Sequence, residues 1–516
     1  MRYFTRTFCL AALAVGFSAR VGKAARAETG GQSPWVTVGT DGKLSYQATS
    51  NGDRISDFSY AGYGGGGVTL PIVPVVKEVA PSGTDDSGTI QAAIDAVAAL
   101  PLAEGFRGAI LLKPGTFHCA QPLTISEDGI VLRGSGVHKE GTVIEMTGAP
   151  HVCATIAGSR LRFGKEEPGS SFPIVDAYVP SGAFAVSVKD AKGLAVGDAI
   201  RIQRPVTEKW LHFMGMDTLV RNGKPQTWIK RDSLITVERT IQAIDGNRIT
   251  LDVPLADAID TRFLTPAAAT VVRTTAPHRL GHCGVESLRI VSPPPSGTLT
   301  TKNNVAASLD NCQDCWIKDV AMHDTLGNVN VGSGARRVTL DHIDAVHTAT
   351  VAKGAGYPAD FSIRGSQVLI NRCSSSGDGS FYVATLDAAA TLNVALNCNF
   401  RGTGSIQPHM RWSTALLVDS CNLPDGRIEF INRKTAGSGH GWAMAWGVAW
   451  NCTARDYLVE QPPGAMNWSI GCTGEINKDS AKNCFTSHGS PVLPQSLYLA
   501  QLRERLGASA LKNIGY

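Results

Sequence analysis

The chain has 516 residues, which is too long for one ordinary globular core, so the sequence predicts either several domains or an elongated repeat architecture. Charged residues make up 18% of the chain, aromatic residues make up 7%, and 55 glycines supply many turns. This composition favours β structure over long surface helices. The formal net charge of +4 comes from the N-terminal residues, so it does not indicate nucleic-acid binding.

Residues 1–27 have the pattern of a cleavable secretory leader. Arg2 and Arg6 precede the apolar stretch "TFCLAALAVGFSA", and the small residues Ala25 and Ala27 suit a peptidase that cuts after Ala27. A membrane anchor is the alternative, but the stretch is shorter than the roughly 20 residues of a spanning helix. Removing the five basic residues of the leader from the 48 leaves 43 against 44 acidic residues. We therefore expect a secreted protein, periplasmic or extracellular, with no membrane span after leader removal.

After an N-terminal segment at residues 28–80, the stretch "PSGTDDSGTIQAAIDAVAALP" predicts one amphipathic helix. Asp85 or Asp86 can cap it, and apolar residues follow at helical spacing: Ile90, Ile94, Val97 and Leu100. Short β-rich runs come next, "GAILLKPGTFHC", "LTI", "GIVLRGSG" and "TVIEM", without room for crossover helices between them. Residues 81–159 are thus predicted to hold a helix and the first strands of either a sandwich or a solenoid.

Residues 160–275 have a different pattern and are predicted to form an inserted β subdomain. "AFAVSVKDAKGLAVGDAIRIQRP" and "ERTIQAIDGNRITLDVPL" alternate strongly and contain the turn signals "VGD" and "DGN", which predict antiparallel hairpins. Between them, a loop-like stretch carries Trp210 and Trp228 beside basic residues. Exposed aromatic side chains in such loops are candidate substrate contacts, and a loop packed beneath the insertion is the alternative.

Residues 276–475 contain an approximate repeat that distinguishes a solenoid from a sandwich. Five alternating apolar strands each end in cysteine, at Cys373, Cys398, Cys421, Cys452 and Cys472, with steps of 25, 23, 31 and 20 residues. Stacked coils about 4.8 Å apart would place these cysteines in an internal ladder. Disulfides or a metal site are the alternatives, but "CQDC" has no second pair to complete a site, and removing Cys9 with the leader leaves an odd number of cysteines.

The C-terminal region, residues 476–516, ends in a predicted helix. "PQSLYLAQLRERLG" has leucines near helical spacing and stops at Gly507. We expect this helix to cap the last coils and to protect their open edge.

The helix "DDSGTIQAAIDAV", followed by "GAILLKPGTF" and "GIVLRGSG", resembles the opening of the pectate-lyase-like superfamily of right-handed parallel β-helix proteins. The resemblance covers Pro81 to about Gly158 and resumes from about His282 to Gly474. It implies an all-β fold in which the helix plugs the N-terminal end of a right-handed parallel β-helix. Activity does not follow from it, because this scaffold carries lyases, hydrolases, epimerases and phage receptor-binding proteins.

Coil spacing then indicates which polar residues become neighbours. Twenty-two residues before His409 is Asp387, and 22 or 23 residues after Arg411 are Arg433 and Lys434. The glycine-rich loop "AGSGHGW" would bring His440 and Trp442 to the same patch, which also receives Trp412. We therefore predict His409, Arg411, Arg433, Lys434 and His440 as catalytic residues, and Trp412, Trp442, Tyr382, Asp387, Trp210 and Trp228 as substrate-binding residues.

This cationic, histidine-bearing patch fits elimination better than hydrolysis. Glycosidases need two carboxyl groups, whereas the patch has one, and the Asn-Thr-Asp and Asp-Asp motifs of polygalacturonase-type hydrolases are matched only by Asp378 in "SSGDGSFY". Removal of the proton beside a uronate carboxylate needs cations and a base. We predict a lyase acting on an anionic polysaccharide, with Tyr382 as a further proton donor. A hydrolase, a uronate C5-epimerase and a non-catalytic glycan-binding protein are the alternatives. Ca²⁺ could assist, but no acidic cluster identifies its ligands.

Overall fold

The computed structural model describes residues 30–158, 165–275, 278–293, 304–348, 359–377 and 381–516. The predicted leader, residues 1–27, lies outside these ranges, as does Asp378. In the part of the chain that is described, no helix is both long enough and apolar enough to cross a membrane.

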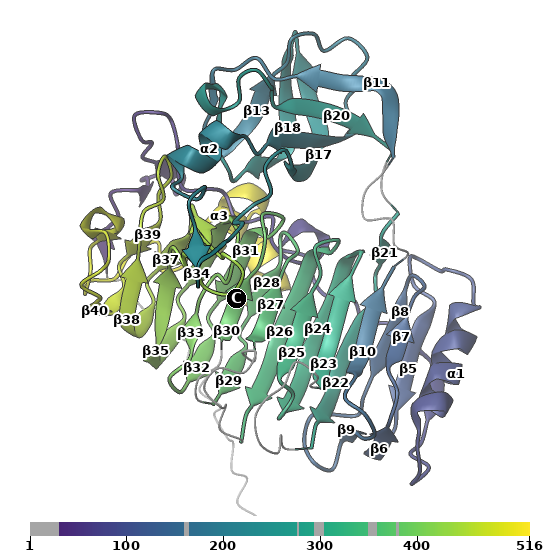
Figure 1. Ribbon diagram of the computed structural model, residues 1–516. Coiled ribbons are helices and arrows are strands. Elements are labelled where there is room, and N and C mark those ends of the chain that lie inside the picture. Colours follow the sequence, from purple (N-terminus) through teal and green to yellow (C-terminus); the bar gives the residue numbers. More distant parts are fainter. Residues whose placement is uncertain (1–29, 159–164, 276–277, 294–303, 349–358, 378–380) are drawn as a thin grey trace, which may run out of the picture.

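The chain winds into a right-handed parallel β-helix, as the sequence predicts, and strands of successive coils pair in parallel along three faces (Figure 1). The first face contains β4 (Val75–Val79), β5 (Gly108–Leu112), β8 (Ile130–Arg133), β22 (Gly284–Val291), β24 (Cys312–His323), β26 (Arg336–Val346), β28 (Leu369–Asn371), β31 (Thr391–Leu396), β34 (Ser413–Asp419), β37 (Val448–Trp450), β39 (Trp468–Ile470) and β41 (Phe485–Thr486).

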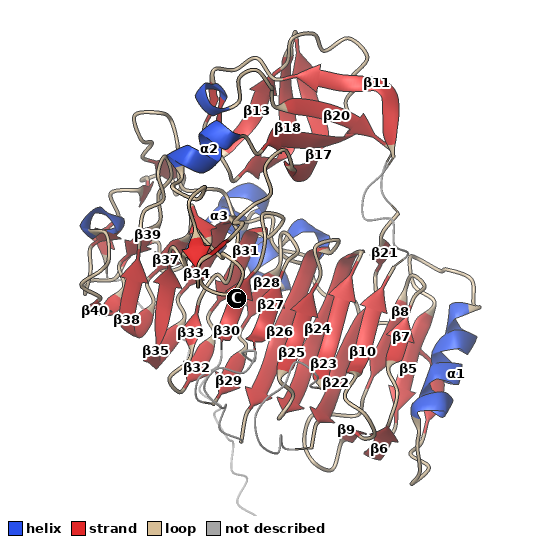
Figure 2. Ribbon diagram, viewed as in Figure 1, coloured by secondary structure: helices blue, strands red, loops and turns tan. Residues whose placement is uncertain are grey.

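The second face contains β6 (Gly115–Cys119), β9 (Thr142–Met146), the second halves of β22, β24 and β26, β29 (Ser374–Ser376), β32 (Asn399–Arg401), β35 (Asn422–Phe430), β38 (Thr453–Val459) and β40 (Thr473–Ile476). The third face contains β7 (Leu123–Ile125), β10 (Val152–Ala157), β23 (Val305–Asp310), β25 (Gly327–Val331), β27 (Ala359–Ile363), β30 (Phe381–Thr385), β33 (Ser405–Ile406) and the second halves of β35 and β38. Helices are few and lie outside these faces (Figure 2).

The predicted cysteine ladder is confirmed. Residues next to the cysteines pair in register, Ser374 with Asn399 and Asn422 with Thr453, and all the described cysteines are buried and free. The thiol of Cys421 lies 3.4 Å from the carbonyl oxygen of Ala395 on the preceding coil. Burial raises the pKa of the Cys398, Cys421, Cys452 and Cys472 thiols well above the usual range, so these residues act as small apolar core groups.

The residue before each ladder cysteine makes the bend from the first face to the second. These residues have left-handed backbone, with φ between 48° and 66°, and they are Arg372, Asn397, Ser420, Asn451 and Gly471. Asn and Gly tolerate this conformation best, which explains why several of the repeated strands end in Asn or Gly before Cys.

Helix α1 (Ser87–Ala98) lies at the end of the stack beside β5, β7 and β8 (Figure 1). Three of its predicted apolar residues, Ile90, Ile94 and Val97, are buried in the main core, whereas Leu100 lies beyond the helix and is 40% exposed. The helix therefore covers core side chains that no preceding coil could cover.

The insertion leaves the β-helix after β10 and rejoins it before β21 (Leu280–Gly281). It forms its own sheet, in the order β11 (Glu166–Pro173), β20 (Thr270–Thr274), β14 (Ala199–Pro205), β17 (Leu234–Asp245), β18 (Arg248–Leu255) and β13 (Ala183–Ser187). The predicted "DGN" hairpin exists between β17 and β18. The predicted "VGD" hairpin is wrong, because β13 pairs with β18 and β14 pairs with β17. The two stretches with alternating apolar residues nevertheless form antiparallel β strands, as predicted.

A second apolar cluster lies on the outer side of the first face. The C-terminal helix α3 (Leu497–Leu506) packs there through Leu497, Tyr498 and Leu502, and it ends at Gly507, as predicted. The backbone N–H of Tyr498 donates to Asp419 at the end of β34. The helix thus lies along the side of several coils, whereas the sequence interpretation placed it over the open edge of the last coils.

Candidate functional site

The candidate site lies along the edge where third-face strands end and the chain turns back to the first face. Arg364 follows β27, Asp387 follows β30, His409 and Arg411 follow β33, and Arg433 follows β35. The insertion leaves the β-helix at the corresponding edge, after β10. We call His409, Arg411, Arg433 and His440 the basic cluster. Its members come from two successive coils, so parallel stacking brings them together.

Arg433 links the two coils of the basic cluster. Its Nη1 donates to the backbone oxygen of His409 at 2.8 Å and lies 3.2 Å from Nδ1 of His440. The structure thus places Arg433 beside His409 and His440, as coil spacing indicates. Lys434 differs, because its side chain is exposed and makes no hydrogen bond or ion pair within the described residues.

The glycine-rich loop between β35 and β36 (Met444–Ala445) folds back on itself and carries His440 into the cluster. Arg433 N–H donates to Gly441 O at 2.8 Å, and Gly441 N–H donates to Lys434 O at 2.9 Å. Gly437 has φ of 56°, and a Cβ at this position would lie 2.1 Å from Nε2 of His440. The loop can hold His440 at this place only because residue 437 lacks a side chain.

Arg411 binds the same loop from the other side. Its Nη2 donates to Oγ of Ser438 at 2.6 Å, and its backbone N–H donates to His440 O at 3.3 Å. Both Arg411 and its neighbour Trp412 have left-handed backbone, with φ of 62° and 65°. Such a conformation is costly for large side chains and is often found where function constrains the backbone.

Both histidines of the basic cluster are neutral at neutral pH. Burial, followed by the charges of Arg433, His440 and Arg364, lowers the pKa of His409 to about 3. Burial, Arg433 and Arg411 lower the pKa of His440 to about 4. Their ring centroids are 4.8 Å apart, and the His409 ring meets the Phe381 ring edge-on at 5.2 Å. A neutral imidazole can accept a proton, so the cluster combines a base with fixed positive charge.

The two imidazoles have different surroundings. Because an arginine can only donate, Nδ1 of His440 accepts from Arg433, and its Nε2 faces Gly437. Within the described residues, the ring nitrogens of half-buried His409 have no hydrogen-bond partner. His409 is therefore the imidazole that is free to react, and His440 holds Arg433 in place.

Three polar residues beside the cluster were not found by sequence reasoning. Arg364 pairs with Asp387 at 3.4 Å, and Gln407 donates to the buried carboxylate of Glu429. Stepping back one more coil from Asp387 would have reached Arg364, and the 22-residue step from Gln407 to Glu429 follows the same spacing. Asp387 thus joins the site through Arg364, on the coil before Arg411.

The predicted aromatic contacts are mostly internal. Trp228, Trp210 and Trp412 are 1%, 6% and 3% exposed and pack ring against ring where the insertion meets the β-helix. Trp442 donates from Nε1 to Met214 O at 3.1 Å in the same junction. Tyr382 is fully buried and stacks on Phe400 at 4.8 Å, so it cannot donate a proton to a substrate. The packed-loop alternative therefore describes Trp228, whereas Trp210 and Trp412 pack at the junction and also line a pocket there, so their role in substrate binding stays a prediction.

The junction places the insertion against the glycine-rich loop. Arg221, the last residue of the short strand β15 (Val220–Arg221), which pairs with β16 (Lys224–Pro225), donates to Gly437 O. A Cβ on Gly439 would lie 2.9 Å from Gln226, and a Cβ on Gly441 would lie 2.4 Å from Trp228. The insertion therefore supports the loop that carries His440, which a reading of the solenoid repeat alone does not indicate.

No metal centre is evident in the described ranges, where no group of three or more His, Cys, Asp or Glu side chains converges. Acids beside the basic cluster already serve protein partners, Asp387 with Arg364, Glu429 with Gln407 and Glu460 with the backbone N–H of Asn432. No residue set here therefore fits Ca²⁺, which prefers several convergent oxygen ligands.

Comparison with known proteins finds likeness at the level of fold only. No protein-family model matches the chain, and no curated protein sequence matches it significantly. The tailspike gp49 of Pseudomonas phage LKA1 is 12% identical over 76% of this chain and 69% of its own, with a TM-score of 0.29. The A-module of the mannuronan C-5 epimerase AlgE6 of Azotobacter vinelandii is 10% identical over 79% and 95%, with a TM-score of 0.32.

A polygalacturonase from Erwinia carotovora is 10% identical over 81% of this chain and 96% of its own, with a TM-score of 0.25. These solved structures are right-handed parallel β-helix proteins of the pectate-lyase-like superfamily, the family that the sequence resembles. At such low similarity they say nothing about which reaction, if any, the basic cluster performs.

Proposed function

We propose that the protein cleaves a uronate-containing polysaccharide by β-elimination at the basic cluster. The observation that carries the proposal is the free, neutral imidazole of His409 next to the guanidinium of Arg433, which donates to the His409 backbone oxygen at 2.8 Å. A base and a fixed cation at one place are what proton removal beside a carboxylate requires.

In the proposed reaction, the substrate carboxylate binds Arg433 and Arg411. His409 takes the proton from C5, the C–H electrons form the C4–C5 double bond, and the C4–O bond to the leaving sugar breaks. The leaving oxygen gains a proton, which His409 can return to it. The products are one chain with an unsaturated end and one ordinary chain, so atoms and charge balance.

Substrate binding would also strengthen the base. The positive charge of Arg433 is one cause of the low pKa of His409. A bound carboxylate offsets that charge, so the pKa of His409 rises towards its usual value when substrate is present. The cluster would therefore be a weak base when empty and a stronger one when filled.

A hydrolase needs one carboxylic acid to hold a proton and a second carboxylate opposite it. The acids beside the cluster, Asp387 and Glu429, are engaged by Arg364 and Gln407, and the group left free is an imidazole. This arrangement favours elimination over hydrolysis.

The test is to incubate the protein with a panel of polyuronates while recording the ultraviolet absorbance of unsaturated uronate and the number of reducing ends. We expect both signals to rise together. Reducing ends without the absorbance would instead establish hydrolysis, altered uronate stereochemistry without new ends would establish epimerisation, and no change on any glycan would favour a binding protein.

A further inference from the structure

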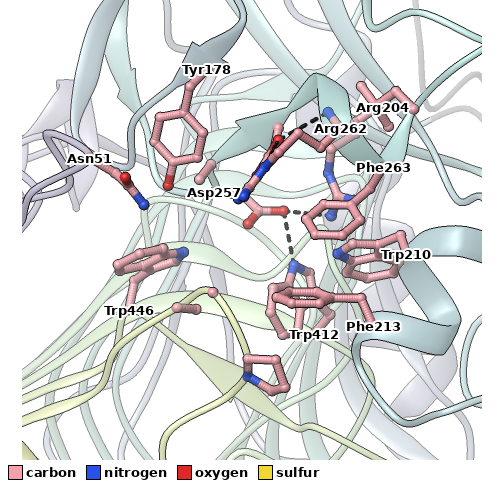
Figure 3. Close-up of a pocket in the computed structure, with 16 residues that line it drawn as sticks. Asn51, Tyr178, Arg204, Trp210, Phe213, Asp257, Arg262, Phe263, Trp412 and Trp446 are labelled. Carbon is pink, nitrogen blue, oxygen red and sulfur yellow. Dashed lines mark hydrogen bonds and ion pairs between the residues drawn. The ribbon is translucent and has the colours of Figure 1, made fainter.

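A pocket lies where the insertion, the N-terminal segment and the β-helix meet, and Trp412 is part of its wall. Its walls are largely aromatic (Figure 3), and the main lining side chains are Asn51, Tyr178, Phe213, Arg262, Phe263 and Trp446. Phe213 and Phe263 stack at 4.3 Å, and Trp446 lies below Tyr178 in the view shown. Aromatic walls with a few polar groups are typical of sites for small organic ligands.

The charges in this pocket cancel in pairs. Arg204 donates to Asp257 at 2.7 Å, and Nε of Arg262 donates to Asp260 at 3.0 Å. The basic cluster differs, because it holds two arginine side chains, Arg411 and Arg433, beside two neutral imidazoles, and within the described residues these arginines donate to uncharged groups. The pocket thus has no charge that selects a carboxylate, whereas the cluster does.

The polar groups of the pocket suit hydroxyl groups. Carboxylates such as Asp260 accept hydrogen bonds, and the exposed Asn51 amide and Arg262 guanidinium donate them. The apolar C–H face of a sugar ring packs on aromatic faces such as those of Phe213 and Trp446. Two buried donors in the wall, Nε1 of Trp446 and Nε of Arg204, have no partner in the described structure, so a small shift of either towards an occupant would gain a hydrogen bond.

The pocket and the basic cluster receive side chains from two consecutive residues, Arg411 and Trp412. Arg411 extends to Ser438 in the glycine-rich loop, whereas Nε1 of Trp412 donates to Asp257 in the pocket wall at 2.8 Å. Consecutive residues therefore contribute to the two places, which suits neighbouring sugar residues of one glycan.

We infer that this junction pocket binds one uncharged sugar residue of the glycan, and that the substrate is therefore a heteropolysaccharide in which a neutral sugar lies near the uronate. The inference rests on the proposed function for the uronate at the basic cluster. It adds a subsite and a substrate class that the cluster alone does not indicate.

The test uses the full-length protein with ¹⁵N-labelled tryptophan and follows the indole N–H signals by NMR. The Trp446 signal is assigned by its loss in Trp446→Phe. The probes are the methyl glycosides of glucose, mannose, galactose and rhamnose, with glucuronate and galacturonate for comparison. We expect at least one neutral glycoside to shift the Trp446 signal in a saturable way, and the uronates to shift it less.

Two matched arginine variants test the pocket. Each variant is compared by its affinity for the neutral glycoside. Arg262→Ala should weaken that affinity several-fold. Arg231→Ala, which removes an arginine that is similarly exposed and also paired with an acid, should not.

The inference is overturned if no neutral glycoside shifts the Trp446 signal, if uronates shift it more strongly, or if Arg262→Ala binds as the unaltered protein does. The proposed function is judged separately, by the absorbance assay of the unaltered protein on a panel of homopolyuronates and of uronate-containing heteropolysaccharides. Cleavage of any of these glycans without a shift of the Trp446 signal would contradict the subsite and leave the elimination standing. A shift of the Trp446 signal without cleavage of any of them would contradict the elimination and leave the subsite standing.

Discussion

Nη1 of Arg433 lies 3.2 Å from Nδ1 of His440 and 2.8 Å from the backbone oxygen of His409. One guanidinium thus connects two coils and sets the charge that both imidazoles experience. The predictions that follow concern this connection and the scaffold that holds it.

Replacing Arg433 by Met should reduce kcat/KM on a polyuronate by about 100-fold or more, because a fixed positive charge next to the developing negative charge is lost. The same change should raise the pKa of His409 and His440, since the positive charge lowers both. Steady-state kinetics and NMR titration of the imidazoles measure the two effects. Lys434→Met is the control. Lys434 is the next residue in the sequence, but its side chain is exposed and does not contact the basic cluster. Equal losses in both variants would contradict the assignment.

Gly437→Ala should displace His440 without unfolding the protein. The new methyl group would meet Nε2 of His440 at 2.1 Å, and φ of 56° strains any residue with a side chain. We expect a clear loss of kcat with near-unaltered circular dichroism. Gly246→Ala, in the β17–β18 turn, is the control, because it has φ of 57° and open space around its Cβ position. Unchanged kcat in Gly437→Ala would show that the position of His440 is unimportant.

Stability should fall in mild acid because of the two buried imidazoles. The folded-state pKa values, about 3 for His409 and about 4 for His440, lie below the ordinary value of 6.5. At pH values between the folded-state pKa and the ordinary pKa, the unfolded chain binds more protons than the folded chain. The free energy of unfolding therefore rises with pH in this range. We expect Tm to fall as pH drops from about 6.5 towards 4. His409→Gln should flatten this slope, and an unchanged slope would contradict the low pKa of His409.

The cysteines of the ladder should not react with thiol reagents in the folded protein. The described cysteines are buried and free, and burial raises the thiol pKa of Cys398, Cys421, Cys452 and Cys472. A thiol reagent should therefore label none of them under native conditions and all of them in denaturant. Rapid native labelling of a ladder cysteine, located by mass spectrometry, would show that the coils open.

The repeat could be predicted from the sequence because the stacking of coils places the same structural requirements on corresponding positions of every coil. Each ladder position must be small and apolar, and the residue before it must tolerate a left-handed bend, so Asn-Cys recurs at Asn397 and Asn451. Coil spacing also located His409 and Arg433, since in-register pairing converts sequence distance into contact.

Other features depend on contacts between distant segments and could not be read from spacing. Trp210 and Trp228 lie in a polar stretch that suggests exposure, but they are buried because the insertion folds back on Trp412. Tyr382 is buried in the core, where the pairing of β30 with β33 is irregular between Phe381 and Val383. Arg221 supports the glycine-rich loop from more than 200 residues away, which no local pattern reveals.

The central claim is that His409 removes the C5 proton of a uronate. It is tested most directly by NMR of the products that unaltered protein and His409→Gln form from the same polyuronate, with His138→Gln, at an exposed histidine, as the control. We predict C4–C5 unsaturated ends from the unaltered and control proteins, and a loss of about 100-fold to 10,000-fold in their rate of formation with His409→Gln. Saturated ends only, or unsaturated ends formed at full rate by His409→Gln, would contradict the account.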